Sequence, residues 1–232
     1  SRIFVRLTNN DPPQPLTDGP SDMFPSWSPD GKFIAFTRQT TSESGLYIVP
    51  ALGGPARKVL SINARQFVQG CSAQPRWSPR SDQLIFAIWD DKTCRVKILS
   101  LETFSQRVLT SPVAPMWDDV PAFSPDGRSI AFVRRNIFNG DVYTINPDGS
   151  GLRRVTHGVD PDMYPDWSPD ASKLAFFTEH GGLTNKREVW KVFADGTHLK
   201  RLTNNNVDDS YPSWSPSGGR ICGTISFGSS IA

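Results

Sequence analysis

A twelve-residue phrase recurs five times, beginning Pro-x-Trp-Ser-Pro in four copies and Pro-x-Phe-Ser-Pro in the third, and it limits the folds open to this chain. A second phrase, such as Leu46–Pro50 or Val142–Ile145, lies between the copies and precedes an Arg/Leu/Thr-rich run such as Leu152–Thr156. Each unit therefore holds four short β-type runs, separated by turn residues such as Pro-Asp-Gly. Four strands in about 45 residues indicate one blade of a β-propeller. The copies start at Pro25, Pro75, Pro121, Pro165 and Pro212.

The spacing of the copies predicts a closed ring. Successive prolines lie 50, 46, 44 and 47 residues apart, and joining residue 232 to residue 1 would make the last interval 45. The start of the chain, at 2–6 and 14–17, resembles the last two runs of a unit, and the end supplies the first two. We therefore predict an all-β fold, a five-bladed β-propeller of four-stranded antiparallel blades closed by strands from both termini. The alternative is a piece of a larger propeller. The predicted single domain, 1–232, has blades at about 25–60, 75–110, 121–156, 165–203, and 212–232 completed by 1–17.

Composition excludes several classes of protein. A formal charge of +2 gives no support for nucleic-acid binding, and no apolar run approaches the roughly 20 residues of a membrane span. The three cysteines form no Cys-x-x-Cys pair, so a zinc site is not predicted. The chain starts at Ser1 with no recognisable signal peptide, which suggests a mature chain or a domain of a longer protein.

The phrase Pro-x-Trp-Ser-Pro-Asp-Gly-x-x-Ile-Ala-Phe, followed by Leu-Tyr and Arg-Leu-Thr, resembles the TolB-type, WD-like propeller family over essentially the whole chain. Five blades would be a departure, since members of that family usually have six or more. The resemblance implies protein or peptide partners, a place in a larger protein or complex, and a periplasmic or extracellular location. Related propellers stand beside catalytic domains, but this chain has neither a Gly-x-Ser-x-Gly elbow nor a kinase loop.

Acidic residues recur three positions before four of the repeat prolines, at Asp22, Asp118, Asp162 and Asp209. Propeller symmetry would bring them to the mouth of the central channel, where like charges need compensation. One hypothesis is a Ca²⁺ or Mg²⁺ site with these four aspartates as oxygen ligands. The alternatives are local hydrogen bonds to backbone N–H groups and the binding of a basic peptide segment. No other cofactor is indicated.

The links before the first strand and after the second strand of each unit vary most, and they would share one face of a propeller. We predict that this face binds a partner. Cys71 and Cys94 would lie on it together, and a disulfide between them is one hypothesis, with two thiols as the other. The partner-binding candidates are Asp22, Trp117, Asp118, Asp119, Asp162, Tyr164, Asp209 and Tyr211.

The function that these features favour is a non-catalytic protein- or peptide-binding module. No Ser/His/Asp arrangement can be nominated, because the three histidines share no motif. The alternatives are a hydrolase or lyase with a divalent ion at the channel mouth, and a sugar-binding propeller that uses exposed aromatic residues such as Trp117.

Overall fold

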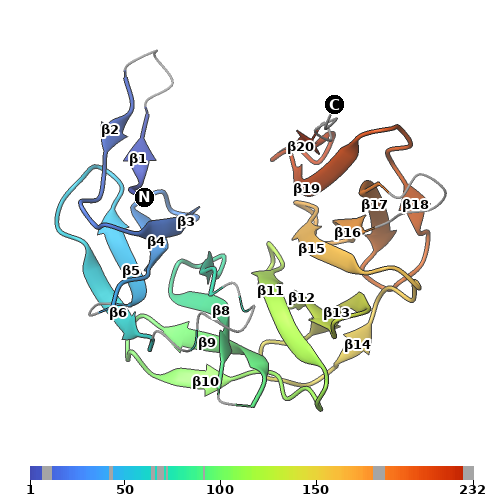
Figure 1. Ribbon diagram of the computed structural model, residues 1–232, viewed down its shortest axis with the longest axis horizontal. Helices are drawn as coiled ribbons and strands as arrows, with labels where there is room; N and C mark the ends of the chain where they lie inside the picture. Colours follow the sequence, from blue (N-terminus) through green and yellow to red (C-terminus); the bar gives the residue numbers. More distant parts are fainter. Residues whose placement is uncertain are drawn as a thin grey trace, which may run out of the picture. The chain divides into compact units, whose positions relative to one another are not determined.

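The computed structural model describes residues 1–6, 12–41, 44–63, 66, 71, 73–90, 92–179 and 186–226. The chain divides into two compact units, residues 1–108 and 109–232. Strands dominate both units and pair only in antiparallel fashion within the described ranges (Figure 1). The all-β prediction is therefore confirmed.

The first unit contains a two-stranded sheet and two four-stranded sheets. The two-stranded sheet pairs β1 (Phe4–Val5) with β2 (Gln14–Pro15). Sheet 1 consists of β3 (Asp22–Trp27), β4 (Phe33–Arg38), β5 (Gly45–Pro50) and β6 (Arg57–Ser61). Sheet 2 consists of β7 (Arg76–Trp77), β8 (Gln83–Trp89), β9 (Cys94–Ser100) and β10 (Gln106–Val108). Each of the two larger sheets corresponds to one sequence repeat.

The second unit repeats this plan. Sheet 3 consists of β11 (Trp117–Phe123), β12 (Ile130–Arg135), β13 (Gly140–Ile145) and β14 (Arg153–Arg154). Sheet 4 consists of β15 (Asp162–Trp167), β16 (Lys173–Thr178), β17 (Glu188–Phe193) and β18 (Lys200–Arg201). The last pair consists of β19 (Asp208–Trp214) and β20 (Ile221–Ser226).

The predicted fifth blade is not formed as one four-stranded sheet. Strands β1 and β2 belong to the first unit and β19 and β20 to the second, and each pair is a separate sheet. Four repeats thus form the predicted four-stranded antiparallel sheets. The number of blades and the closure of the ring stay predictions.

The Ser-Pro-Asp-Gly phrase forms the turn between the first two strands of a sheet. In sheet 1 the Ser28 hydroxyl donates to the Asp30 carboxylate over 2.6 Å and accepts from the Phe33 backbone N–H over 2.9 Å. Sheets 3 and 4 make the same pair of bonds, which satisfies polar groups at the turn. In sheet 2, where Arg80 replaces the aspartate, Asp82 supplies the carboxylate over 2.7 Å. The repeated turn aspartates are therefore structural.

Tryptophans of the repeat bind one sheet to the next within each unit. The Trp77 indole N–H donates to the Ser26 carbonyl over 2.8 Å, and the Trp167 indole N–H donates to the Ala122 carbonyl over 3.2 Å. In both cases the acceptor lies one residue before the matching position of the preceding repeat. Sheet 3 has Phe123 at that position, which has no N–H group to donate.

The core of each unit lies between its sheets. The phenylalanine that ends the repeated phrase is fully buried in all four larger sheets, at Phe36, Phe86, Phe132 and Phe176. The fifth copy has Gly223 at this position. The packing of a large aromatic ring is therefore missing there, and β20 is mostly exposed.

A β-bulge interrupts the first strand of four repeats. The residue before the repeat proline has a positive φ at Phe24, Val120, Tyr164 and Tyr211, between 50° and 56°. The register shifts at the same points, so that two residues oppose one on the neighbouring strand. This left-handed conformation is costly for residues other than glycine, and such strain often accompanies binding sites.

Candidate functional site

Two of the predicted aspartates are held by arginines of the next strand. Asp22 pairs with Arg38 and Asp118 with Arg134, and in both pairs Nε and a terminal nitrogen donate to the two carboxylate oxygens over 2.6–3.0 Å. Both carboxylates are fully buried. Burial opposes ionisation of Asp22, but bonds from Arg38, Thr17 and the Gly19 backbone outweigh it, so the pKa of Asp22 lies below its usual range.

The other two aspartates have different partners. Asp162 accepts a hydrogen bond from the Thr178 hydroxyl over 2.7 Å, and Asp209 accepts one from the Asn205 amide over 2.7 Å. Burial raises the pKa of Asp162 to about 6, despite hydrogen bonds from Thr178 and Thr156. Asp162 is therefore a buried carboxyl group to which none of the described arginines is bonded.

The predicted metal site stays a hypothesis. Within the described ranges, no three His, Cys, Asp or Glu side chains come together as potential ligands. Each of the four aspartates, Asp22, Asp118, Asp162 and Asp209, accepts a hydrogen bond from a nearby side chain of its own unit.

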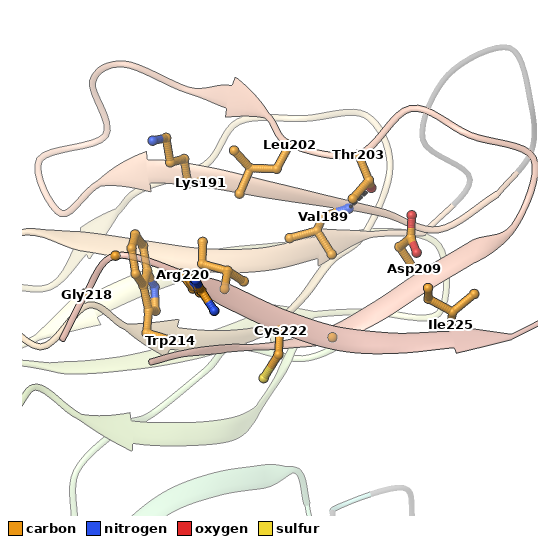
Figure 2. Close-up of a pocket in the computed structure, with 13 residues that line it drawn as sticks. Val189, Lys191, Leu202, Thr203, Asp209, Trp214, Gly218, Arg220, Cys222 and Ile225 are labelled. Carbon is orange, nitrogen blue, oxygen red and sulfur yellow. Dashed lines mark hydrogen bonds between the residues drawn. The ribbon is translucent and has the colours of Figure 1, made fainter. Parts of the chain in front are cut away.

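Asp209 lines a cavity of about 490 Å³ beside the last pair of strands (Figure 2). Val189 and Leu202 form its wall on the sheet 4 side, while Ile225 lies on β20. Gly223 also lines it, at the position where the other sheets have a buried phenylalanine. The missing aromatic side chain helps to explain why the two walls are not packed together.

The bulges of β15 and β19 place two tyrosines side by side. The rings of Tyr164 and Tyr211 meet edge to face with their centroids 4.6 Å apart, and both contact Phe177, with centroids 5.5–5.7 Å apart. Burial and the neighbouring Tyr211 raise the pKa of Tyr164 to about 12. Tyr211 is 47% exposed, so the cluster reaches the surface. The Arg187 guanidinium lies 5.6 Å from the Phe177 ring centroid.

Trp117 and Asp119 lie near this cluster on β11. Arg135 contacts both, with its guanidinium 5.3 Å from the Trp117 ring centroid and 3.5 Å from the Asp119 carboxylate. Asp119 and Arg135 are also close enough to Tyr164 to affect its pKa. We name Trp117, Asp119, Arg135, Tyr164, Phe177, Arg187 and Tyr211 the aromatic cluster.

The aromatic cluster contains four of the predicted partner-binding residues, namely Trp117, Asp119, Tyr164 and Tyr211. Asp118 points to the opposite face of β11 from Asp119, because neighbouring strand residues alternate. The sequence analysis did not identify Arg135, Phe177 or Arg187. The sequence nevertheless contained part of the signal. Each of these residues lies at or near the end of the second strand or the start of the third, beside the variable link that was predicted to lie on the binding face.

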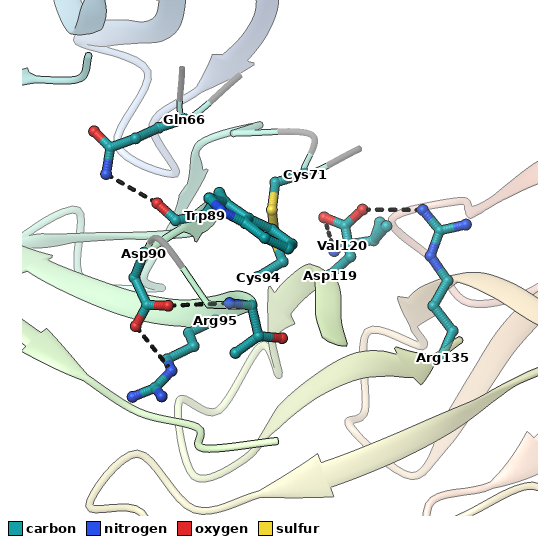
Figure 3. The surroundings of a disulfide bond; sticks show 10 residues. Gln66, Cys71, Trp89, Asp90, Cys94, Arg95, Asp119, Val120 and Arg135 are labelled. Carbon is teal, nitrogen blue, oxygen red and sulfur yellow. Dashed lines mark hydrogen bonds and ion pairs between the residues drawn. A yellow bond between two sulfur atoms is a disulfide. The ribbon is translucent and has the colours of Figure 1, made fainter. Parts of the chain in front are cut away.

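A disulfide joins Cys71 and Cys94 in the first unit, with a Cα–Cα distance of 5.9 Å (Figure 3). The surrounding polar groups are also paired. Asp90 forms an ion pair with Arg95 over 2.9 Å, and the Gln66 amide donates to the Trp89 carbonyl over 2.9 Å. The bond ties the segment before β7 to the start of β9.

The repeat, the four-stranded sheets and the tryptophan bonds between sheets agree with a family comparison. The family model of the TolB beta propeller domain (PD40) matches residues 68–229. The chain belongs to this family. The TolB-type propeller resemblance of the sequence is therefore confirmed.

A curated protein matches most of the length of this chain. The uncharacterized protein Atu1656 of Agrobacterium fabrum is 29% identical over 173 residues, which are 72% of this chain and 53% of that protein. The chain thus spans about half the length of this curated relative.

Two solved structures share the fold. TolB from Acinetobacter baumannii has a TM-score of 0.73 at 21% identity, covering 92% of this chain and 51% of that one. An oligogalacturonate lyase in complex with manganese has a TM-score of 0.72 at 18% identity, covering 93% and 62%. At these identities the likeness shows the fold alone. In the described part of this TolB-type chain, no helix is long and apolar enough to cross a membrane.

Proposed function

We propose that this TolB-type domain is a non-catalytic module that binds a protein or peptide segment at the aromatic cluster. The observation that carries the proposal is the Tyr164–Tyr211 pair, which stands on two strained bulges and leaves Tyr211 47% exposed. Tyrosine offers a large, rigid contact area with little loss of side-chain entropy on binding. Two such rings, on the first strands of two different sheets, could together hold a side chain of a partner.

The charges around the aromatic cluster favour a polypeptide over a strongly charged ligand. Arg135 lies 3.5 Å from Asp119, and Arg187 lies 3.6 Å from Glu179, so each guanidinium is close to a carboxylate. A basic peptide is less well supported than the sequence suggested, because Asp22 and Asp118 already bind arginines of this chain. A partner segment would bring an apolar side chain to Tyr211 and polar groups to the charged rim.

We also propose that the domain works outside the cytoplasm as part of a larger protein or complex. The Cys71–Cys94 disulfide supports an oxidising compartment, where such bonds persist. Coverage of about half of the Agrobacterium fabrum relative supports a longer protein. The loop face around a central channel, which the sequence favoured, is the broader surface of which the aromatic cluster would form a part.

The test is a selection of peptides from a phage-displayed library against the wild-type domain. Selected peptides are then measured by fluorescence polarisation against wild type, Tyr211→Ser and a control variant, Phe104→Ser. Phe104 is a matched control, because it is 44% exposed but lies between β9 and β10 in the first unit. We expect Tyr211→Ser to weaken binding by about tenfold or more and Phe104→Ser to leave it unchanged. Equal binding by wild type and Tyr211→Ser would contradict the proposal.

A further inference from the structure

A second cavity in the second unit, of about 310 Å³, lies apart from the aromatic cluster, between sheet 4 and the link that joins sheet 3 to it. Its walls are mainly apolar, and polar groups are few. Such a volume and lining are typical of a small-molecule pocket, near the lower end of the usual size range. The apolar walls and the tryptophan come from Val155, Phe176, Trp190, Val192 and Leu199.

Asp162 and Thr178 lie on neighbouring strands and form part of the polar lining of this cavity, together with Thr156, His157 and Asp160. Thr178 takes the place of an arginine, because it is the cross-strand partner of Asp162 just as Arg134 is of Asp118. The substitution removes a guanidinium from the position that it fills in sheet 3. A buried carboxylate and an open cavity therefore occur where sheet 3 has an ion pair.

Among the residues that the structure describes, the other charged groups near Asp162 do not balance it. Asp160 and His157 lie on the link before β15 and line the same cavity. Asp141 on β13 interacts with Asp162 through like charge, while Arg154 is bonded to Asp141 over 2.7 Å. One carboxylate oxygen of Asp141 is buried without a hydrogen bond. Three carboxylates thus share one nearby arginine, which gives the site a surplus of negative charge.

We propose that this cavity binds an organic cation, an ammonium or guanidinium group on a short apolar stem, with Asp162 as the counter-ion. The charged head takes the place that the arginine has in sheet 3. The stem contacts Val155, Val192 and Leu199, and the Trp190 ring adds a cation–π surface. This site is independent of partner binding at Tyr211.

The first experiment compares benzylamine with benzyl alcohol, a neutral molecule of nearly the same shape, by calorimetry and NMR titration at about pH 7.5. We expect benzylamine to bind with a Kd of about 1 mM or tighter, and benzyl alcohol to bind at least about tenfold more weakly. Equal affinities for the two molecules, or no saturation by benzylamine at about 10 mM, would overturn the proposal.

Two variants locate the site. Thr178→Arg restores the partner found in sheet 3 and fills the cavity, so it should abolish benzylamine binding while the fold is kept. Asp162→Asn should weaken binding by about tenfold or more. Glu102→Gln, an exposed change in the first unit, is the control for net charge, and Tyr211→Ser is the control for the aromatic cluster. Unchanged binding by Thr178→Arg would contradict the assignment even if Asp162→Asn does not fold.

Two further measurements ask whether the ammonium group belongs to a lysine side chain or to a free amine, and whether Asp162 must be ionised for binding. Binding of the peptide Gly-Lys-Gly as tight as that of benzylamine would assign a lysine side chain, and weaker peptide binding would assign a free amine. Affinity for benzylamine should fall as the pH is lowered through about 6, because protonation of Asp162 removes the counter-charge. A pH-independent affinity would contradict the role of Asp162.

Discussion

Sheets 3 and 4 each carry a buried aspartate at the same position of the first strand, but they neutralise it differently. Asp118 receives two hydrogen bonds from Arg134, whereas Asp162 receives one from Thr178 at the equivalent cross-strand position. The arginine leaves the first carboxylate paired within its sheet. The threonine leaves the second with a pKa raised to about 6 by burial, beside a cavity of about 310 Å³.

The difference shows that the repeat fixes the place of the carboxylate, while one residue on the next strand sets its chemistry. The same backbone register holds both aspartates. A scaffold of this kind can therefore hold an ion pair in one sheet and a titratable pocket in the next without a change of fold. Single substitutions in sheet 3 or sheet 4 can test this difference.

The largest effect is expected from Arg134→Thr, which gives sheet 3 the residue of sheet 4. Asp118 would stay fully buried without its counter-charge, so the free energy of unfolding should fall by about 3 kcal/mol at neutral pH. Urea denaturation measures the loss. A loss below about 1 kcal/mol would show that the pair contributes no more than an exposed ion pair, and would contradict the role given to the arginine in sheet 3.

An effect of opposite sign and at most similar size is expected from Asp162→Asn. The folded state holds a proton on Asp162 more readily than the unfolded state, because burial raises the pKa of this group from 3.8 to about 6. Wild type therefore loses stability as the pH rises from about 4 through 6, and the variant should gain on it by up to roughly 3 kcal/mol at about pH 8. Urea denaturation at several pH values measures this difference. A pH-independent difference would contradict the raised pKa.

The smallest difference is expected at the turns, where sheets 3 and 4 share most bonds. Asp126→Asn and Asp170→Asn each replace a carboxylate that accepts from a serine hydroxyl over 2.6 Å and from a backbone N–H group. Asp170 also accepts from the Ser172 hydroxyl over 2.8 Å, so its replacement should cost slightly more, with both losses of stability on the order of 1 kcal/mol or less. Thermal unfolding of the two variants side by side checks this. A larger loss for Asp126→Asn than for Asp170→Asn would contradict this prediction.

The repeat predicts the sheets well because its signals are local. Turn residues, alternating β-type runs and the spacing of the prolines all act over a few positions, and four repeats form four-stranded sheets as expected. The partners of the aspartates were also present in the sequence, since Arg38 and Arg134 follow Asp22 and Asp118 by 16 residues. That spacing becomes informative only when the register of the bulged strands is known.

The rest depends on contacts between sheets, for which the sequence has no local signal. The meeting of Tyr164 with Tyr211, and of Arg135 with Trp117, depends on how the sheets pack in the second unit. The convergence of the acidic side chains stays a prediction, although Asp22 and Asp118 each bind an arginine of their own sheet. Burial of Asp162 likewise follows from its neighbours and not from its own motif.

The indole bonds of Trp77 and Trp167 have a consequence for how such chains evolve. Each bond joins a sheet to the backbone of its predecessor, and a backbone carbonyl is present whatever residue is there. A duplicated repeat therefore carries the tryptophan that forms this hydrogen bond, and it needs no matching mutation in the repeat before it. Duplication or deletion can therefore lengthen or shorten the array one repeat at a time. Selection can then alter single residues, such as the threonine at 178, without changing the contacts between sheets.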